Sequence, residues 1–173
     1  MNNKSWVIKA FIFTFFITIL ISGLSNVIAE NSNIIVLIII TFLILFLGIL
    51  FDIIGTSVLT AKESSFHAKA ANKINGSKEC IKLIKNASTI SSFCNDVIGD
   101  ICGIVSGSMG TMIAIYITNQ LGFNKTLSAL VIASVISSLT VGGKAIGKTI
   151  AVKNSDEIIF LVGKFISKFK KGK

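Results

Sequence analysis

Oxygen-bearing side chains inside apolar stretches are the residues of this sequence best suited to chemistry. Asp52, Asp96 and Asp100 fall within or at the edge of long uncharged runs, and Asn95 adjoins Asp96. An ionised carboxylate near lipid is costly unless it is paired or hydrated, so each aspartate is a candidate functional residue. Asp96 and Asp100 are four residues apart and therefore share a helix face. Because carboxylate and amide oxygens are hard ligands, this set predicts a site for Mg²⁺ or a similar cation.

Two lysines provide an alternative to a metal ion. Lys144 and Lys148 are also four residues apart, and we expect them at a comparable depth on the cytoplasmic side. Two aspartates facing two lysines would neutralise each other without any cation. The residues alone therefore leave a cation site and structural Asp–Lys pairs equally open.

Long apolar runs must position these side chains. A helix needs about 20 apolar residues to cross the hydrocarbon core of a bilayer. Four runs qualify: residues 10–29, residues 31–51 with a continuation to about 60, residues from about 90 to 118, and residues 126–143. Hydrophobic residues make up 52% of the chain and charged residues only 14%, which argues against a soluble domain and excludes disorder. The sequence predicts an all-α fold, a polytopic transmembrane helical bundle of about four spans.

The lysines indicate the topology. The chain has 17 lysines, no arginine and eight acidic residues, for a net charge of +9. Two lysines precede the first run, six lie between the second and third, one lies between the third and fourth, and eight follow the fourth. The positive-inside rule then predicts a multi-pass protein of the inner cell membrane with both termini in the cytoplasm. We expect contacts with the lipid bilayer and anionic lipids, and none with nucleic acid.

The first apolar run has a second interpretation. Lys4 and Lys9, the apolar residues after them and Val27-Ile28-Ala29 are similar to a cleaved signal peptide. The apolar core of such a peptide is usually shorter, about 7–15 residues. We therefore expect residues 1–32 to form an extra, retained N-terminal transmembrane helix.

Two further segments combine lysines with apolar residues at helical spacing. Residues 61–88 contain six lysines and a break at Asn75-Gly76, and residues 156–168 repeat the pattern with Asp156 and Glu157 at the start. Both are typical of amphipathic juxtamembrane helices on the inner leaflet. We expect residues 33–153 to form the main transmembrane domain and residues 154–173 a basic C-terminal juxtamembrane helix.

Small residues recur at intervals of four in the third and fourth runs. They include Gly99, Gly103, Gly107, Ala129, Ala133 and Ser137. This spacing lets helix backbones approach closely. It predicts tight packing within the bundle or the seam of a homodimer, and we expect a homodimer.

One segment matches a nucleotide-binding pattern. Residues 142–149 satisfy G-x-x-x-x-G-K-[ST], but a true phosphate-binding loop follows a strand and begins a soluble helix, whereas this segment ends a predicted span. The chain has one histidine and neither a G-x-S-x-G nor an H-E-x-x-H pattern. We therefore do not expect an enzyme.

Three short motifs carry a family resemblance. Gly76-Ser77-Lys78-Glu79-Cys80-Ile81 corresponds to a G-A-K-x-A-L element, Cys94-Asn95-Asp96 stands in place of G-N-N, and residues 143–152 stand in place of G-E-x-x-P-K-x-x-A. In order and spacing, from about Leu47 to Phe165, they resemble the membrane domain of the cyclin M / CorB–CorC magnesium transporters. Asn95 is the family residue that this resemblance carries over intact.

The sequence also departs from the family pattern. Gly55 and Lys144 stand where the family has acidic residues, and Gly147 stands in place of a proline. Lys144 would place its ammonium beside the bound cation. Two like unit charges at about 4 Å repel by about 4 kcal/mol at an effective dielectric constant of about 20. Asp96 and Asp100 would have to supply the missing oxygens.

The resemblance implies transport of a divalent cation, with Mg²⁺ as the transported ion. The metal ligands that we expect are Asp52, Thr56, Asn95, Asp96 and Asp100, with Lys144 and Lys148 as counter-ions in the empty state. The cytosolic CBS pair of the family does not follow, so a separate CBS-containing protein is an expected partner. The alternative function is a non-transporting membrane scaffold or regulatory subunit that Asp–Lys pairs hold together.

Overall fold

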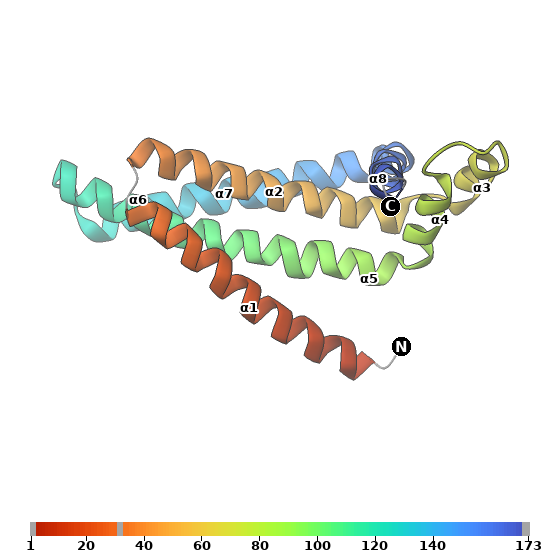
Figure 1. Ribbon diagram of the computed structural model, residues 1–173. Helices are drawn as coiled ribbons and strands as arrows, with labels where there is room; N and C mark the ends of the chain where they lie inside the picture. Colours follow the sequence, from red (N-terminus) through yellow and green to blue (C-terminus); the bar gives the residue numbers. More distant parts are fainter. Residues whose placement is uncertain (1–2, 31–32, 171–173) are drawn as a thin grey trace. The chain divides into compact units, whose positions relative to one another are not determined.

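The computed structural model describes residues 3–30 and 33–170, and every regular element in that part of the chain is helical. The helices are α1 (Asn3–Glu30), α2 (Ile34–Thr60), α3 (Glu63–Ala71), α4 (Ser77–Lys85), α5 (Ala87–Ser92), η1 (Phe93–Gly99), α6 (Asp100–Leu121), α7 (Lys125–Lys153) and α8 (Ser155–Lys170) (Figure 1). The all-α prediction is confirmed for these residues. The boundary predicted at residue 32 and the lysines Lys171 and Lys173 lie outside them.

The chain divides into two compact units. The first unit comprises Met1–Ile49 and Val97–Gly143, and the second unit comprises Leu50–Asp96 and Lys144–Lys173. The divisions fall within α2, η1 and α7. Each unit therefore contains a part of the same long helices.

Three helical stretches of the described residues are long and apolar enough to cross a membrane. They are Ile34–Thr60, Ala87–Leu121 and Lys125–Lys153, and they correspond to the second, third and fourth predicted spans. Within α1, Ala10–Leu24 is a shorter apolar stretch of the described residues. Length and composition therefore support three of the four predicted spans.

A π-helix interrupts the stretch Ala87–Leu121. Phe93–Gly99 forms η1 between α5 and α6, where the sequence predicts a continuous α-helix. A π-turn holds more residues than an α-turn and is frequent at functional sites. Asn95 and Asp96 both lie in η1, so the wider turn sets the directions in which their side chains project.

Close contacts between helices build the core of the first unit. Leu37 of α2 packs with Met109 and Ile113 of α6. A Cβ at Gly48 would lie 2.9 Å from Cys102 Cβ, so this glycine lets α2 approach α6 as small residues do in membrane bundles. α1 also contacts α6.

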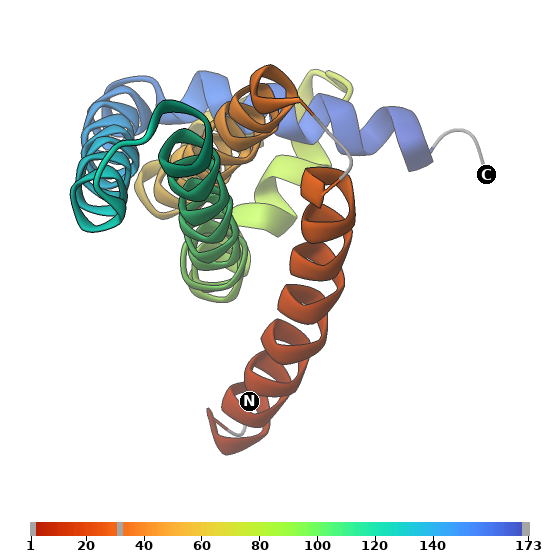
Figure 2. The ribbon, with the colours of Figure 1, turned by 90° about the vertical axis from the view of Figure 1, so that its left-hand side faces the viewer.

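The core of the second unit joins four helices. Val58 of α2, Phe66 of α3, Cys80 of α4 and Ile159 of α8 are buried together. Burial raises the pKa of the Cys80 thiol above its ordinary value. α8 crosses the ends of α2 and α7 in this unit, since it is seen end-on in Figure 1 and lengthwise in Figure 2.

Two glycines let α4 and α8 approach each other. Gly76 lies at the predicted break and has φ +90°, a conformation that favours glycine, and a Cβ there would lie 2.7 Å from the backbone nitrogen of Lys164. A Cβ at Gly163 would overlap Cys80 Sγ, whose thiol donates to the Ile159 carbonyl at 3.3 Å. The predicted break is therefore confirmed, and it provides the surface on which α8 packs.

α7 is one unbroken helix that continues ten residues beyond the predicted end of the span at 143. At its start, the Asn124 side-chain oxygen accepts hydrogen bonds from the backbone nitrogens of Thr126 (2.9 Å) and Leu127 (3.3 Å), as an N-cap does. Residues 142–149, which match the nucleotide-binding pattern, lie inside this helix. They form helical turns rather than a phosphate-binding loop.

Candidate functional site

α2 and η1 meet in the second unit at Gly55 and Asn95. A Cβ built at Gly55 would overlap Asn95 Oδ1 and would lie 3.1 Å from Cys94 Cβ. Glycine is therefore the residue that leaves room for the amide at this point. As a result, the Asn95 oxygen packs directly against the backbone of α2.

Asp52 lies on the same side of α2 as this contact. It is 3% exposed and precedes Gly55 by three residues, which makes the two neighbours on the helix surface. In the described part of the chain, Asp52 Oδ2 and Asn95 Oδ1 are both buried without a hydrogen-bond partner. Buried polar atoms without partners are uncommon and costly. These two oxygens are therefore the ligand candidates of the second unit.

A serine orients the Asn95 amide. Asn95 Nδ2 donates to Ser91 Oγ at 3.3 Å, and Ser91 is itself buried. With the nitrogen held in this way, Oδ1 is the atom that faces Gly55. Sequence reasoning missed Ser91, although its position four residues before Asn95 was a usable signal.

Two hydroxyl residues of α2 lie just beyond Gly55. Ser57 is fully buried, and its hydroxyl donates to the Ala151 carbonyl of α7 at 3.4 Å. Thr56 is half-buried, and its carbonyl accepts the Thr60 hydroxyl at 3.1 Å. Ser57 was not predicted as a site residue; it fastens α2 to α7 within the second unit.

The other predicted site residues are more exposed. Asp96, Asp100 and Lys148 are exposed and Lys144 is half-buried. Within the described residues, neither Asp96 nor Lys148 has an ion-pair partner. Among those residues, no three His, Cys, Asp or Glu side chains come together to hold a metal ion. The structure thus buries Asp52 and leaves the two aspartates that follow Asn95 at the protein surface.

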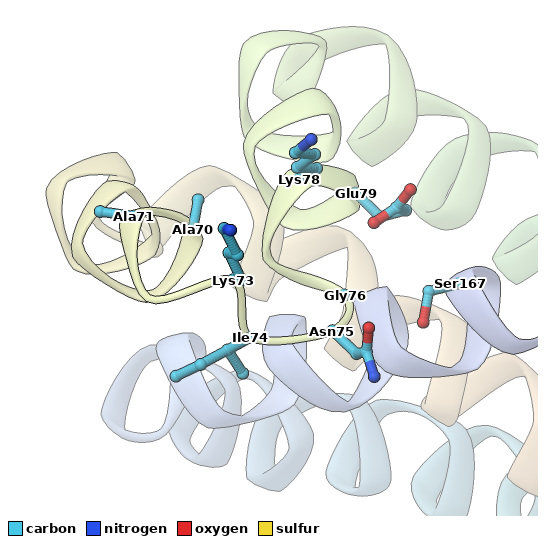
Figure 3. A pocket seen from close by; sticks show the side chains of 9 residues that line it. All are labelled: Ala70, Ala71, Lys73, Ile74, Asn75, Gly76, Lys78, Glu79 and Ser167. Carbon is cyan, nitrogen blue, oxygen red and sulfur yellow. The ribbon is translucent and has the colours of Figure 1, made fainter.

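The cavity drawn in Figure 3 lies elsewhere in the second unit. It has a volume of about 470 Å³ and is lined by Ala70, Ala71, Lys73, Ile74, Asn75, Gly76, Lys78, Glu79 and Ser167. Its charged groups are two lysines and one glutamate, and the predicted metal ligands are not among its lining residues. This cavity does not have the charge of a divalent-cation site.

A groove of about 240 Å³ lies in the first unit between α6 and α7. It is lined by Gly103, Gly107, Gly110, Thr111, Ala129, Ala133, Ile136, Ser137, Thr140 and Val141. A Cβ at Gly103 or Gly107 would meet no atom within 4 Å. Apart from Gly99, which lies in η1, the predicted small residues do line this groove, but Gly103 and Gly107 border open space instead of a tight contact.

Comparisons with known proteins identify no relative. Neither protein-family models nor curated proteins nor solved structures gave a match to this chain. The family resemblance therefore rests on the sequence motifs alone.

Proposed function

We propose that this chain is a multi-pass protein of the inner cell membrane that transports a divalent cation, with Mg²⁺ as the first substrate to test. Both termini lie in the cytoplasm, and α1 forms a fourth span in addition to the three long apolar stretches. The distribution of lysines supports this topology, and the motifs that resemble those of the cyclin M / CorB–CorC transporters support the substrate.

The observation that carries the proposal is the pair of buried oxygens without partners, Asp52 Oδ2 and Asn95 Oδ1. A buried carboxylate needs a positive charge to offset its lost hydration, and in the described residues Asp52 has no ion-pair partner. Mg²⁺ prefers oxygen ligands and usually keeps several of its waters when a protein binds it. In the proposed site, these two oxygens and the retained waters hold the ion in transit, and Thr56 follows Asp52 by one turn of α2.

Gly55 fits this proposal although the family pattern has an acidic residue there. The space that a side chain at position 55 would need is filled by Asn95 Oδ1. Asp52 carries a carboxylate one turn earlier on the same helix. In the proposed site, the negative charge comes from Asp52 and the neutral oxygen comes from Asn95.

A non-transporting scaffold is the second candidate. It is favoured by the finding that the described residues bring no three His, Cys, Asp or Glu side chains together. In a scaffold, the contact of Ser57 with Ala151 would only hold α2 against α7, and the contact of Asn95 with Ser91 would only fix the Asn95 amide.

Uptake of Mg²⁺ into proteoliposomes, with Mn²⁺ and Co²⁺ as competitors, tests the proposal. Asp52→Asn keeps the shape of the side chain and removes its charge, and we expect at least tenfold slower uptake, which corresponds to a loss of about 1.4 kcal/mol. Asp96→Asn is the matched control because it removes the same charge from an exposed position. Since exposed charges contribute little, its uptake should change by less than about twofold.

The scaffold predicts a different pattern for the same proteins. The unaltered chain would transport no cation under any ion gradient or voltage. Asp52→Asn would also raise the Tm regardless of Mg²⁺, because it removes a buried charge that nothing neutralises. If Asp52→Asn and Asp96→Asn slowed uptake equally, the proposed site would be wrong. The lost negative charge, wherever it lies, would then explain the slower uptake.

A further inference from the structure

α8 has three faces of different character, and the first is buried against the protein. Ile159 is fully buried in the core of the second unit, and Gly163 packs against α4, where a Cβ would overlap Cys80 Sγ. Ser167 follows four residues later, so it lies on the same face. This is the face by which α8 packs against the rest of the second unit.

A second apolar face of α8 is exposed instead of packed against the protein. Leu161, Phe165 and Phe169 are 66%, 65% and 70% exposed, and their spacing of four places them in one line along the helix. The rings of Phe165 and Phe169 contact each other edge to face, with centroids 4.8 Å apart. We call these three residues the α8 stripe. Single exposed apolar residues are ordinary, but a contiguous apolar surface marks an interaction site.

A third face is cationic and borders the α8 stripe. Lys164 and Lys168 are exposed and four residues apart, and each directly precedes a phenylalanine of the stripe. Lys164 Nζ lies over the ring of Phe160, 4.5 Å from its centroid, in a cation–π contact. Long side chains of this kind place their charge at a boundary between apolar and polar surroundings.

We propose that the α8 stripe inserts into the acyl-chain boundary of a leaflet that contains anionic lipid, with Lys164 and Lys168 at the level of the phosphates. The proposal rests on the membrane location proposed above and not on transport. An apolar line beside a row of lysines is the pattern of a helix that lies in a membrane interface. The charge of the lysines is complementary to anionic headgroups.

The position of α8 in the second unit agrees with this assignment. α8 begins two residues after the end of α7 and runs across the ends of α2 and α7 (Figures 1 and 2). A helix that crosses the ends of spanning helices lies along the membrane surface. Its apolar surface is then at the depth where acyl chains meet headgroups.

The cavity of Figure 3 lies on the other side of α8. Ser167, on the protein-facing side of α8, lines this cavity together with Ala71 and Lys78 of the α3–α4 region. If the α8 stripe faces lipid, this cavity faces the aqueous side. Positions on its rim are therefore matched controls for positions in the stripe.

Tryptophan fluorescence in proteoliposomes made with brominated lipids tests the proposal. In a Trp6→Phe background, Phe165→Trp reports on the α8 stripe, Ala71→Trp on the cavity rim, and Leu43→Trp on an exposed apolar position of α2. Brominated acyl chains quench tryptophans that they touch. We expect Leu43→Trp and Phe165→Trp to lose most of their emission and Ala71→Trp to keep it. Emission of Phe165→Trp should also shift to shorter wavelength when phosphatidylglycerol is added to phosphatidylcholine.

The charge requirement is tested with two lysine variants of the Phe165→Trp reporter. Lys168→Gln should reduce the effect of phosphatidylglycerol, whereas Lys78→Gln removes an equal charge from the cavity rim and should leave it unchanged. Equal reduction by both variants would overturn the assigned role of Lys168.

Three other outcomes would overturn the proposal in distinguishable ways. Quenching of Leu43→Trp without quenching of Phe165→Trp would show that the chain is inserted but that α8 does not enter lipid. If Phe165→Trp then also shifted with protein concentration, the α8 stripe would be covered by a second copy of the chain. If neither Leu43→Trp nor Phe165→Trp is quenched, the proposed membrane location is wrong.

Discussion

Two pairs of glycines, one pair in each unit of this protein, have opposite surroundings. In the second unit, Gly76 and Gly163 face atoms of the opposing helix so closely that neither position has room for a Cβ. In the first unit, Gly103 and Gly107 border a groove, and a Cβ at either would meet no atom within 4 Å. Gly163 and Gly103 both lie inside apolar helical stretches and look alike in the sequence. Small residues therefore indicate where helix backbones are able to approach, and the opposing surface decides whether they do.

The opposing surfaces explain the difference. On the α4–α8 side, the glycines face the Cys80 side chain and the backbone of Lys164, which fill the space. On the α6–α7 side, Gly103 and Gly107 border the groove of about 240 Å³, whereas Gly110 on the same helix meets the side chain of Ile136. Apolar side chains beside an unfilled gap lose the van der Waals contacts that a packed neighbour would provide.

The largest effect should come from closing the α4–α8 contact with a methyl group. Gly163→Ala places a Cβ against Cys80 Sγ and 2.8 Å from the Gly76 carbonyl oxygen, and a backbone atom cannot move aside as a side chain does. We expect a loss of about 3 kcal/mol in the free energy of unfolding, the upper end of the cost of overpacking. Thermal unfolding followed by circular dichroism would measure it in detergent.

The matched control for Gly163→Ala is Gly103→Ala, the same substitution inside a helix with open space around it. If both variants lowered the Tm by a similar amount, the comparison between the two units would be wrong. The loss at Gly163→Ala would then not come from the contact at Gly163, and helix formation would not explain it either, because alanine is a better helix former than glycine.

The sequence was sufficient for the helices because their signals are local. The apolar runs, the break at Asn75-Gly76 and the amphipathic pattern of residues 156–168 all correspond to observed helices or connections. The extension of α7 to Lys153 differs from the sequence prediction, in which the lysines after residue 143 mark the end of a span. A lysine marks the edge of the apolar region, but it is also a good helix former and does not end the helix itself.

The candidate site could be predicted only in part. Asp52 and Asn95 were both named, yet nothing in the local sequence shows that Asp52 is buried while Asp96 and Asp100 are exposed. That outcome depends on packing between elements, since Asp52 lies on the side of α2 that contacts η1 at Gly55. The role of Gly55 depends on a contact with a residue forty positions away, which a local pattern does not contain.

A smaller effect should appear in the pH dependence of the α4–α8 contact. Burial raises the pKa of the Cys80 thiol in the folded protein, so the thiol stays protonated in the folded state at a pH where it is already ionised in the unfolded state. This contribution to stability is complete below the unfolded pKa of about 8.5 and is lost as the pH rises through the folded pKa.

We therefore expect the Tm of the unaltered chain to fall more between about pH 7 and about pH 9.5, a range that spans the ordinary thiol pKa, than the Tm of Cys80→Ala. The difference between the two falls isolates the thiol from the lysines and the tyrosine, which both proteins share. An identical fall in both proteins would show that Cys80 is accessible to solvent and that the α4–α8 contact is looser than the structure indicates.

The smallest effect on stability, an increase instead of a decrease, is expected from a substitution in the groove between α6 and α7. Gly107→Ala adds a methyl group where no atom lies within 4 Å, and alanine has less conformational freedom to lose on folding than glycine. The free energy of unfolding should rise by about 0.5–1 kcal/mol, measured as an increase in Tm in dilute detergent.

A decrease in Tm that disappears on dilution of the protein would instead mean that a second copy fills the groove in solution, because the added methyl group then disturbs a contact between chains. In that case Gly107→Leu should convert a dimer to a monomer in size-exclusion chromatography with light scattering, whereas an open groove predicts no change in mass.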